Sequence, residues 1–104
     1  MNSSVKDKSS LLQLLRNHQP EILNFGVERI GLFGSFVRND MKNESDVDFL
    51  VEFKKGKKNY DNFIGLAYYL QEILGRKVEL LTPKSMSPYI GPKIMKEIEY
   101  VVAT

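Results

Sequence analysis

Residues 46–53, with the sequence DVDFLVEF, constrain the fold more strongly than any other segment of the chain. Side chains two positions apart in a β-strand point to the same face of a sheet. Four apolar side chains share one face: Val47, Phe49, Val51 and Phe53. Asp46 and Asp48 lie on the opposite face. The alternation therefore predicts a strand with one face in a hydrophobic core and two carboxylates together on the other.

The segment before it predicts a second strand followed by a tight turn. Val27–Phe33 (VERIGLF) is rich in residues that favour strands, and it stops at Gly34. Gly34-Ser35 is then a turn that leads into a short helix from Ser35 to about Asp40.

The rest of the chain adds helices and a third strand. Apolar spacing predicts a helix over Ser9–His18, with Ser10 and Gln13 as a capping box, and a short turn at residues 21–25. The later segments are a helix over Asn59–Leu74 closed by Gly75, a strand over Lys77–Leu81 and a helix from Pro92 to about Glu99. We expect a small α/β (α+β) domain with helices packed on a mixed sheet of three to four strands. Periodicity does not give the order of the strands.

Composition limits the classes of protein that the chain can represent. Its 104 residues predict a single domain, 1–104, with residues 1–8 frayed and disordered. The absence of cysteine excludes disulfides and cysteine zinc sites. A net charge of +2 does not by itself indicate nucleic-acid binding. No apolar run approaches the ~20 residues that span a bilayer, so the cytoplasm is the default location.

Asp46 and Asp48 are candidate metal ligands. Two carboxylates on one strand face repel each other unless a cation lies between them or water screens them. Mg²⁺ favours carboxylate oxygens and often binds through one or two carboxylates together with substrate phosphates. A solvated strand face is the ordinary alternative. Aspartate is a poor strand former, however, and two of them at the start of an apolar strand favour the metal site.

The turn at Gly34-Ser35 is a candidate phosphate-binding element. Glycine lets the backbone approach a ligand closely and adopt a positive φ angle. Free N–H groups at the start of a helix favour an anion, and the Ser35 hydroxyl adds a donor. The alternative is an ordinary turn in which Ser35 caps the helix. Together with the two aspartates, the turn predicts a site for a metal-bound triphosphate.

Glu79 is a candidate third carboxylate. It is the only acid in the predicted strand Lys77–Leu81. If that strand neighbours residues 46–53, the carboxylate could reach the same cleft, complete a second metal site or accept a proton from an attacking hydroxyl. Glu52 competes for this role but lies too far from the strand end. An exposed strand residue without a function is the alternative for Glu79.

The spacing of these residues resembles a known signature. Gly34-Ser35, ten residues and then Asp46-Val47-Asp48 match the GS-x₁₀-DxD pattern of the DNA polymerase beta-like nucleotidyltransferase superfamily. Residues 32–38 (LFGSFVR) and 45–51 (SDVDFLV) resemble the LFGSxAR and SDxDxxV segments of its minimal nucleotidyltransferase (MNT) members. The resemblance implies a nucleotidyltransferase fold.

The resemblance also implies a role for each candidate residue. Gly34 and Ser35 would hold the β- and γ-phosphates of a nucleotide. Asp46 and Asp48 would ligate two Mg²⁺ ions, with Glu79 as the third carboxylate. The reaction would transfer a nucleoside monophosphate to a hydroxyl and release pyrophosphate, while the metals neutralise charge on the phosphate.

The chain departs from the family pattern at two positions. The third carboxylate of the family is usually aspartate, and the extra methylene of Glu79 leaves its role as a general base open. The family often has glycine where this chain has Asn39, but asparagine tolerates left-handed geometry, so we expect the turn to form. Arg38 either contacts a phosphate or pairs with an acid.

Minimal members of this kind are typically paired with a helical HEPN protein that acts as an RNase toxin. The resemblance implies an antitoxin that transfers AMP from ATP to a tyrosine of that toxin. Two alternatives stay open: a non-catalytic antitoxin that neutralises by direct contact, and a nucleotidyltransferase that acts on a small molecule. The lack of an acceptor-binding domain in 104 residues argues against the small molecule.

Overall fold

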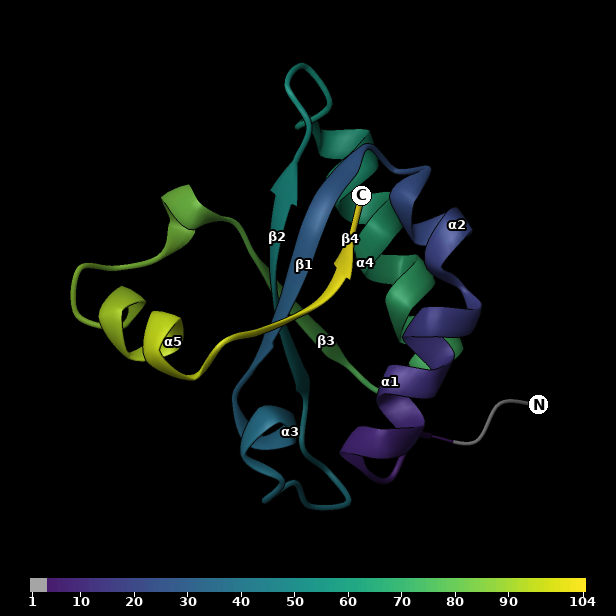
Figure 1. The fold of residues 1–104 in the computed structure, drawn as a ribbon, viewed down its shortest axis with the longest axis vertical. Helices are drawn as coiled ribbons and strands as arrows, with labels where there is room; N and C mark the ends of the chain where they lie inside the picture. Colours follow the sequence, from purple (N-terminus) through teal and green to yellow (C-terminus); the bar gives the residue numbers. More distant parts are fainter. Residues whose placement is uncertain (1–3) are drawn as a thin grey trace.

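The computed structural model describes residues 4–104 and consists of a four-stranded sheet flanked by helices (Figure 1). The strands are β1 (Val27–Phe33), β2 (Val47–Phe53), β3 (Val78–Leu81) and β4 (Glu99–Ala103). The helices are α1 (Lys8–Asn17), α2 (Gln19–Leu23), α3 (Ser35–Arg38), α4 (Tyr60–Leu74) and α5 (Gly91–Glu97), with a 3₁₀ turn at Pro83–Ser85. Within residues 4–104, no helix is both long enough and apolar enough to cross a membrane.

The sheet is mixed, with the strand order β3-β2-β1-β4. Strand β1 lies antiparallel to both β2 and β4, whereas β2 and β3 run parallel. A parallel pair needs a crossover connection, and α4 supplies it between β2 and β3. The predicted α/β class, with helices packed on a mixed sheet of three to four strands, is confirmed.

The last strand, β4, is absent from the sequence-based prediction. The predicted helix from Pro92 to about Glu99 ends earlier, at Glu97, because Ile98 is already extended (φ −61°, ψ 139°). The chain then runs as a strand whose Tyr100 pairs with Gly31 and whose Val102 pairs with Ile30 of β1. Pairing with β1 thus converts a segment too short to show a clear period into the edge of the sheet.

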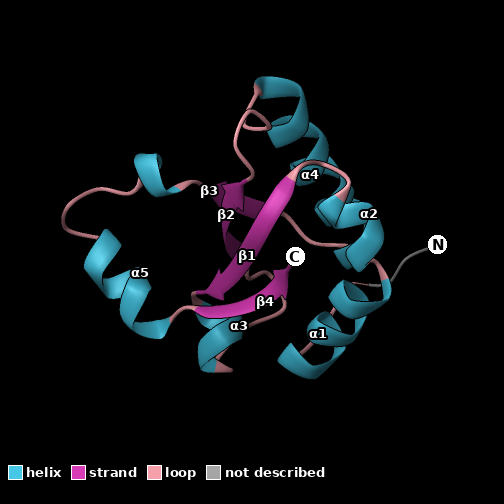
Figure 2. Ribbon diagram, turned by 45° about the horizontal axis from the view of Figure 1, so that its top comes forward, coloured by secondary structure: helices cyan, strands magenta, loops and turns pink. Residues whose placement is uncertain are grey.

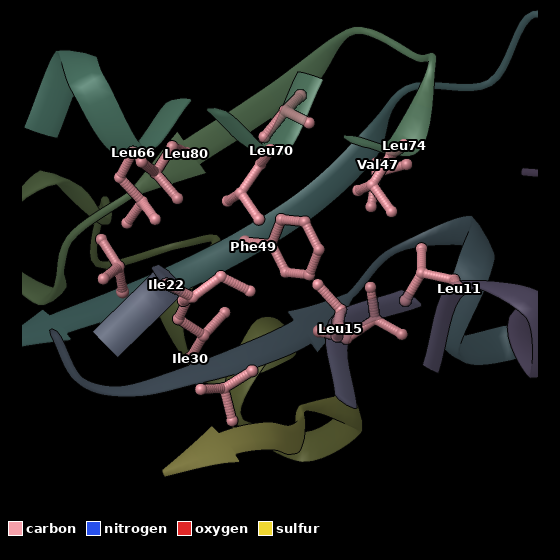
Figure 3. Packing of buried hydrophobic residues seen from close by; sticks show 14 of the residues in the cluster. Leu11, Leu15, Ile22, Ile30, Val47, Phe49, Leu66, Leu70, Leu74 and Leu80 are labelled. Atoms are coloured by element: carbon pink, nitrogen blue, oxygen red, sulfur yellow. The ribbon is translucent and has the colours of Figure 1, made fainter. Parts of the chain in front are cut away.

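The main hydrophobic core lies between the sheet and the group α1, α2 and α4, which cover one face (Figure 2). Phe49 of β2 lies at its centre and is fully buried (Figure 3). The alternation read from residues 46–53 holds in the structure, because Val47, Phe49 and Val51 are all buried in this core. That face is closed to ligands, so any site on the sheet must use the other face.

The opposite face carries a smaller core beneath α5. Phe33 of β1 and Leu50 of β2 are diagonal neighbours across the strand pair and pack against Ile94 of α5. Ile98, directly after the helix, packs on the same cluster. Helix α5 therefore covers only part of this face, and the residues nearer the start of β2 remain accessible.

The first described residues contact the rest of the domain. Residues 1–3 lie outside the described residues, but Val5 is only 4% exposed and its N–H donates to the Leu74 carbonyl. The disorder expected for residues 1–8 stays a prediction, but these contacts join the described residues 4–8 to α4. Helix α1 is capped by Asp7, whose carboxylate accepts from the Ser10 N–H, rather than by a box that begins at Ser10. An apolar side chain and a capping acid anchor this segment.

Candidate active site

Asp48 and Glu79 lie next to each other on neighbouring strands. In the parallel pair, Asp48 of β2 is in register with Glu79 of β3, and on the other side Phe33 of β1 is the partner of Asp48. Residues in register share a face, so both carboxylates lie on the face of Phe33 and Leu50, opposite the main core. The condition set for Glu79, that its strand should neighbour residues 46–53, is met.

Asp48 lies in an environment that resists its ionisation. Partial burial raises its pKa from the ordinary 3.8 to about 6, and the negative charges of Glu79 and Asp46 add to the increase. Arg38 acts in the opposite direction, but its effect is smaller. A carboxyl group with a raised pKa among other carboxylates would be stabilised in its charged form by a cation.

Gly34 brings the backbone directly against Asp48. Its angles are φ 80° and ψ −153°, a region that only glycine adopts readily. A Cβ atom at this position would collide with Oδ2 of Asp48. The turn that starts α3 is therefore in contact with the carboxylate of the next strand, and the sequence needs glycine for both conformation and space.

The short helix after Gly34 starts at the predicted residue but ends before Asp40. Ser35 is the first residue of α3, which ends at Arg38. Asn39 adopts the left-handed conformation (φ 62°, ψ 34°), and it is the one described residue other than glycine with a positive φ. The expectation that asparagine would preserve this turn is confirmed.

Arg38 pairs with acids, as one of its two predicted alternatives requires. Its Nη1 donates to both carboxylate oxygens of Glu97, at 3.0 and 3.2 Å, and its Nε donates to Asp40 at 3.3 Å. Oε2 of Glu97 also accepts from the Gly34 N–H at 2.7 Å. Glu97 is thus part of the site, although sequence reasoning missed it because no local pattern links the end of α5 to the turn.

A second residue that sequence reasoning missed, Arg76, holds the loop before Asp46. Its guanidinium lies over the ring of Phe36 and donates to the carbonyls of Lys42, Asn43 and Ser45 at 2.8–3.1 Å. These contacts fix the backbone immediately ahead of Asp46. The only local signal is its position after Gly75, which does not reveal the partners.

The acids present suit a metal ion, but they do not form a closed cage. Within residues 4–104, no three His, Cys, Asp or Glu side chains are gathered closely enough to hold a metal ion as they stand. Asp48, Glu79 and Asp46 are nevertheless close enough that their charges raise the pKa of Asp48. Mg²⁺ commonly takes one or two carboxylates and completes its shell with water and phosphate oxygens. The donor set therefore fits a metal that arrives with a nucleotide.

Glu52, the competitor considered for the third carboxylate, belongs to another cluster. Its Oε2 accepts from Nε of Arg29 at 2.8 Å and from the Tyr100 hydroxyl at 3.3 Å. This cluster joins β2, β1 and β4, whereas Asp48 lies toward Glu79 and β3. Glu52 stabilises the sheet away from the site, in agreement with the prediction.

With this geometry established, sequence comparison identifies the family. The nucleotidyltransferase domain family matches residues 12–101. The chain belongs to this family. Protein adenylyltransferase MntA of Thermococcus cleftensis is 39% identical over 89 residues, which cover 85% of this chain and 89% of that protein. A protein of Methanocaldococcus jannaschii, provisionally named as a protein adenylyltransferase, is 41% identical over 85 residues, or 82% of this chain and 90% of its own length.

Solved structures agree with the sequence relatives. A structure described provisionally as a minimal nucleotidyltransferase superposes with a TM-score of 0.72 at 26% identity and covers 93% of this chain and 98% of its own. A tri-AMPylated HEPN toxin of Shewanella oneidensis in complex with MNT antitoxin gives a TM-score of 0.56 at 22% identity, over 93% of this chain and 70% of that one. The fold of this nucleotidyltransferase is therefore the one that the GS-x₁₀-DxD pattern implied.

Proposed function

We propose that this nucleotidyltransferase transfers AMP from ATP to a hydroxyl, a tyrosine hydroxyl in particular, of a HEPN toxin and so acts as its antitoxin. The observation that carries the proposal is the pair of carboxylates at Asp48 and Glu79 beside the Gly34 turn. Support comes from relatives that are named protein adenylyltransferases and from the AMPylated toxin complex with the same fold. We expect this reaction to take place in the cytoplasm, where ATP is available.

Each proposed role follows from where a residue lies. Asp46 and Asp48 would hold Mg²⁺, two ions in the full complex, and Glu79 is the third carboxylate on the adjacent strand. When bound, the metal neutralises phosphate charge and lowers the pKa of an attacking hydroxyl. Gly34 and Ser35 would bind the β- and γ-phosphates, since their turn lies directly against Asp48.

Asp48, Glu79 and Arg38 also have proposed roles in the transfer step itself. Ionised Asp48 would help to align the α-phosphorus, because it is partly buried on β2 between its register partners Phe33 of β1 and Glu79 of β3. Glu79 is exposed, so its carboxylate is accessible to a protein hydroxyl and could accept its proton. Arg38 lies on the exposed side of the turn, where it can contact phosphate once it leaves its acid partners.

The test is transfer of label from α-labelled ATP to the cognate HEPN protein in the presence of Mg²⁺. Asp46→Asn/Asp48→Asn should abolish labelling, whereas Glu44→Gln, an exposed acid in the preceding loop, should leave it unchanged. Loss of even one group that stabilises transition-state charge lowers rates by about a hundredfold or more, and this variant neutralises two carboxylates. Neutralisation of the toxin by a stable complex, without label from any nucleotide, would instead establish an antitoxin that acts by contact.

A further inference from the structure

Glu97 accepts hydrogen bonds from two groups that are proposed above to bind a nucleotide phosphate, the Gly34 N–H and the Arg38 guanidinium. Its Oε2 lies 2.7 Å from the Gly34 nitrogen, and both of its oxygens accept from Nη1 of Arg38. The Glu97 side chain is 27% exposed, so solvent screens this contact only in part. Gly34 and Arg38 are two of the residues assigned above to nucleotide binding, and both are turned toward a carboxylate of the chain itself.

We propose that the carboxylate of Glu97 is an internal competitor of the nucleotide, bound to the Gly34 turn in the free protein and displaced by a phosphate oxygen. This inference rests on the proposed function, because it concerns the same phosphate site. A backbone N–H donates one strong hydrogen bond, so Gly34 cannot serve the carboxylate and a phosphate at the same time. Two anions that share one pair of donors also repel each other.

The exchange requires little movement of the backbone. Ile94 and Ile98, on either side of Glu97, remain packed against Phe33 and Leu50, which anchors the end of α5 on the sheet. Rotation of the Glu97 side chain alone is enough to free Gly34 and Arg38. Release of the nucleotide is then assisted by the return of the carboxylate, which satisfies both donors again.

The proposal predicts the sign of a mutational effect. When a fraction of the protein is competent to bind, the apparent Kd rises in inverse proportion to that fraction. Glu97→Gln keeps the shape of the side chain but removes the charge, and charge-assisted hydrogen bonds are about twice as strong as neutral ones. We expect the variant to bind a triphosphate roughly tenfold more tightly. A residue that merely oriented Arg38 would give weaker binding when neutralised.

The control is Glu99→Gln. Glu99 lies two residues further along and pairs with Lys8 at 3.0 Å, away from the Gly34 turn. The substitution removes the same single negative charge from the same segment. A general electrostatic effect would therefore appear in both variants, whereas competition for the donors would appear only in Glu97→Gln.

The experiment measures binding of Mg²⁺–tripolyphosphate and of Mg²⁺–α,β-methylene-ATP by calorimetry, with the Gly34 amide followed by NMR. Glu97→Gln should lower both Kd values, Glu99→Gln should leave them within about twofold of the wild type, and the wild-type Gly34 amide signal should move when ligand is added. Glu97→Ala provides a second variant with the same expected direction. Equal or weaker binding in both Glu97 variants would overturn the proposal.

The same protein preparations are also tested for AMP transfer, which separates this inference from the proposed function. If the wild type labels its HEPN partner and the Glu97 variants gain no affinity, only the competition is refuted. If the Glu97 variants gain affinity but no label is transferred, the competition stands and the enzymatic function fails. If none of the proteins binds either ligand, both proposals are refuted.

Discussion

Replacing Asp48 with asparagine should stabilise the protein at neutral pH even though it removes a proposed metal ligand. Asp48 is partly buried beside Glu79 and Asp46, and its pKa is raised from 3.8 to about 6 mainly by burial. At pH 7 the folded protein therefore carries a charge that its own structure disfavours. Asparagine has nearly the same shape and no charge, so Asp48→Asn removes this destabilising contribution.

The size of the effect follows from the difference in pKa. One pKa unit corresponds to about 1.4 kcal/mol, so the change from 3.8 to about 6 gives an upper limit of about 3 kcal/mol. Solvent reaches part of the side chain and lowers this figure, and we expect a gain of about 1–2 kcal/mol in the free energy of unfolding. For a domain of this size, each kcal/mol raises the Tm by roughly 4–8 °C.

The pH dependence has a defined sign. Well below the unfolded-state pKa of 3.8, the carboxyl group is protonated in both the folded and the unfolded protein, and the wild type and Asp48→Asn should be equally stable. As the pH rises toward 6 and beyond, the unfolded chain loses this proton first, and the wild type loses stability relative to the variant. Urea denaturation at pH 3, 5, 6 and 7, without metal, measures the difference in the free energy of unfolding between the two proteins.

A matched control variant and a second set of measurements with Mg²⁺ test whether the effect on stability comes from the charge of Asp48. Glu44→Gln removes one negative charge from an exposed position and should change stability by less than about 0.5 kcal/mol at every pH. Mg²⁺ should stabilise the wild type and not Asp48→Asn, because the ion favours the charged carboxylate. A variant that is equally or less stable at pH 7, or a difference that does not grow with pH, would refute this account of Asp48.

Three further substitutions test the packing around the site. Gly34→Ala should lower stability by about 2 kcal/mol or more and reduce AMP transfer, since alanine is strained at φ 80° and its Cβ meets Asp48; urea denaturation and label transfer measure both effects. Arg76→Lys should cost about 1–3 kcal/mol, because one ammonium group cannot serve all the carbonyls that the guanidinium contacts; hydrogen exchange in residues 42–45 should increase. Phe49→Ala should cost about 3–5 kcal/mol by opening the main core, a loss visible in the Tm.

The elements predicted well are those in which the hydrophobic pattern continues over many residues, or which end at glycine or proline. The bounds of β1 match the prediction, α4 ends at Gly75 in the left-handed conformation, and the alternation of residues 46–53 gave the correct buried face. Strand β4 was missed because its five residues form a strand only through pairing with β1. The buried position of Val5 likewise depends on the Leu74 carbonyl, which no local pattern reveals.

The candidate site shows the same difference between what local sequence patterns predict and what depends on contacts between distant segments. Gly34, Asp48 and Glu79 could be named as candidates from the sequence, because each is recognised from its residue type and its immediate neighbours in the chain. The contacts of these residues depend on segments far apart in the chain. Glu79 is in register with Asp48 through strand pairing, and Glu97 accepts from the Gly34 N–H across 63 positions of the chain. The motif thus supplies the proposed ligands, whereas a contact distant in sequence places the Glu97 carboxylate on the Gly34 N–H. If Glu97 competes with the nucleotide as proposed, affinity depends on α5 as well as on the signature, and relatives with the same GS-x₁₀-DxD pattern should differ in affinity where the residue at the Glu97 position differs.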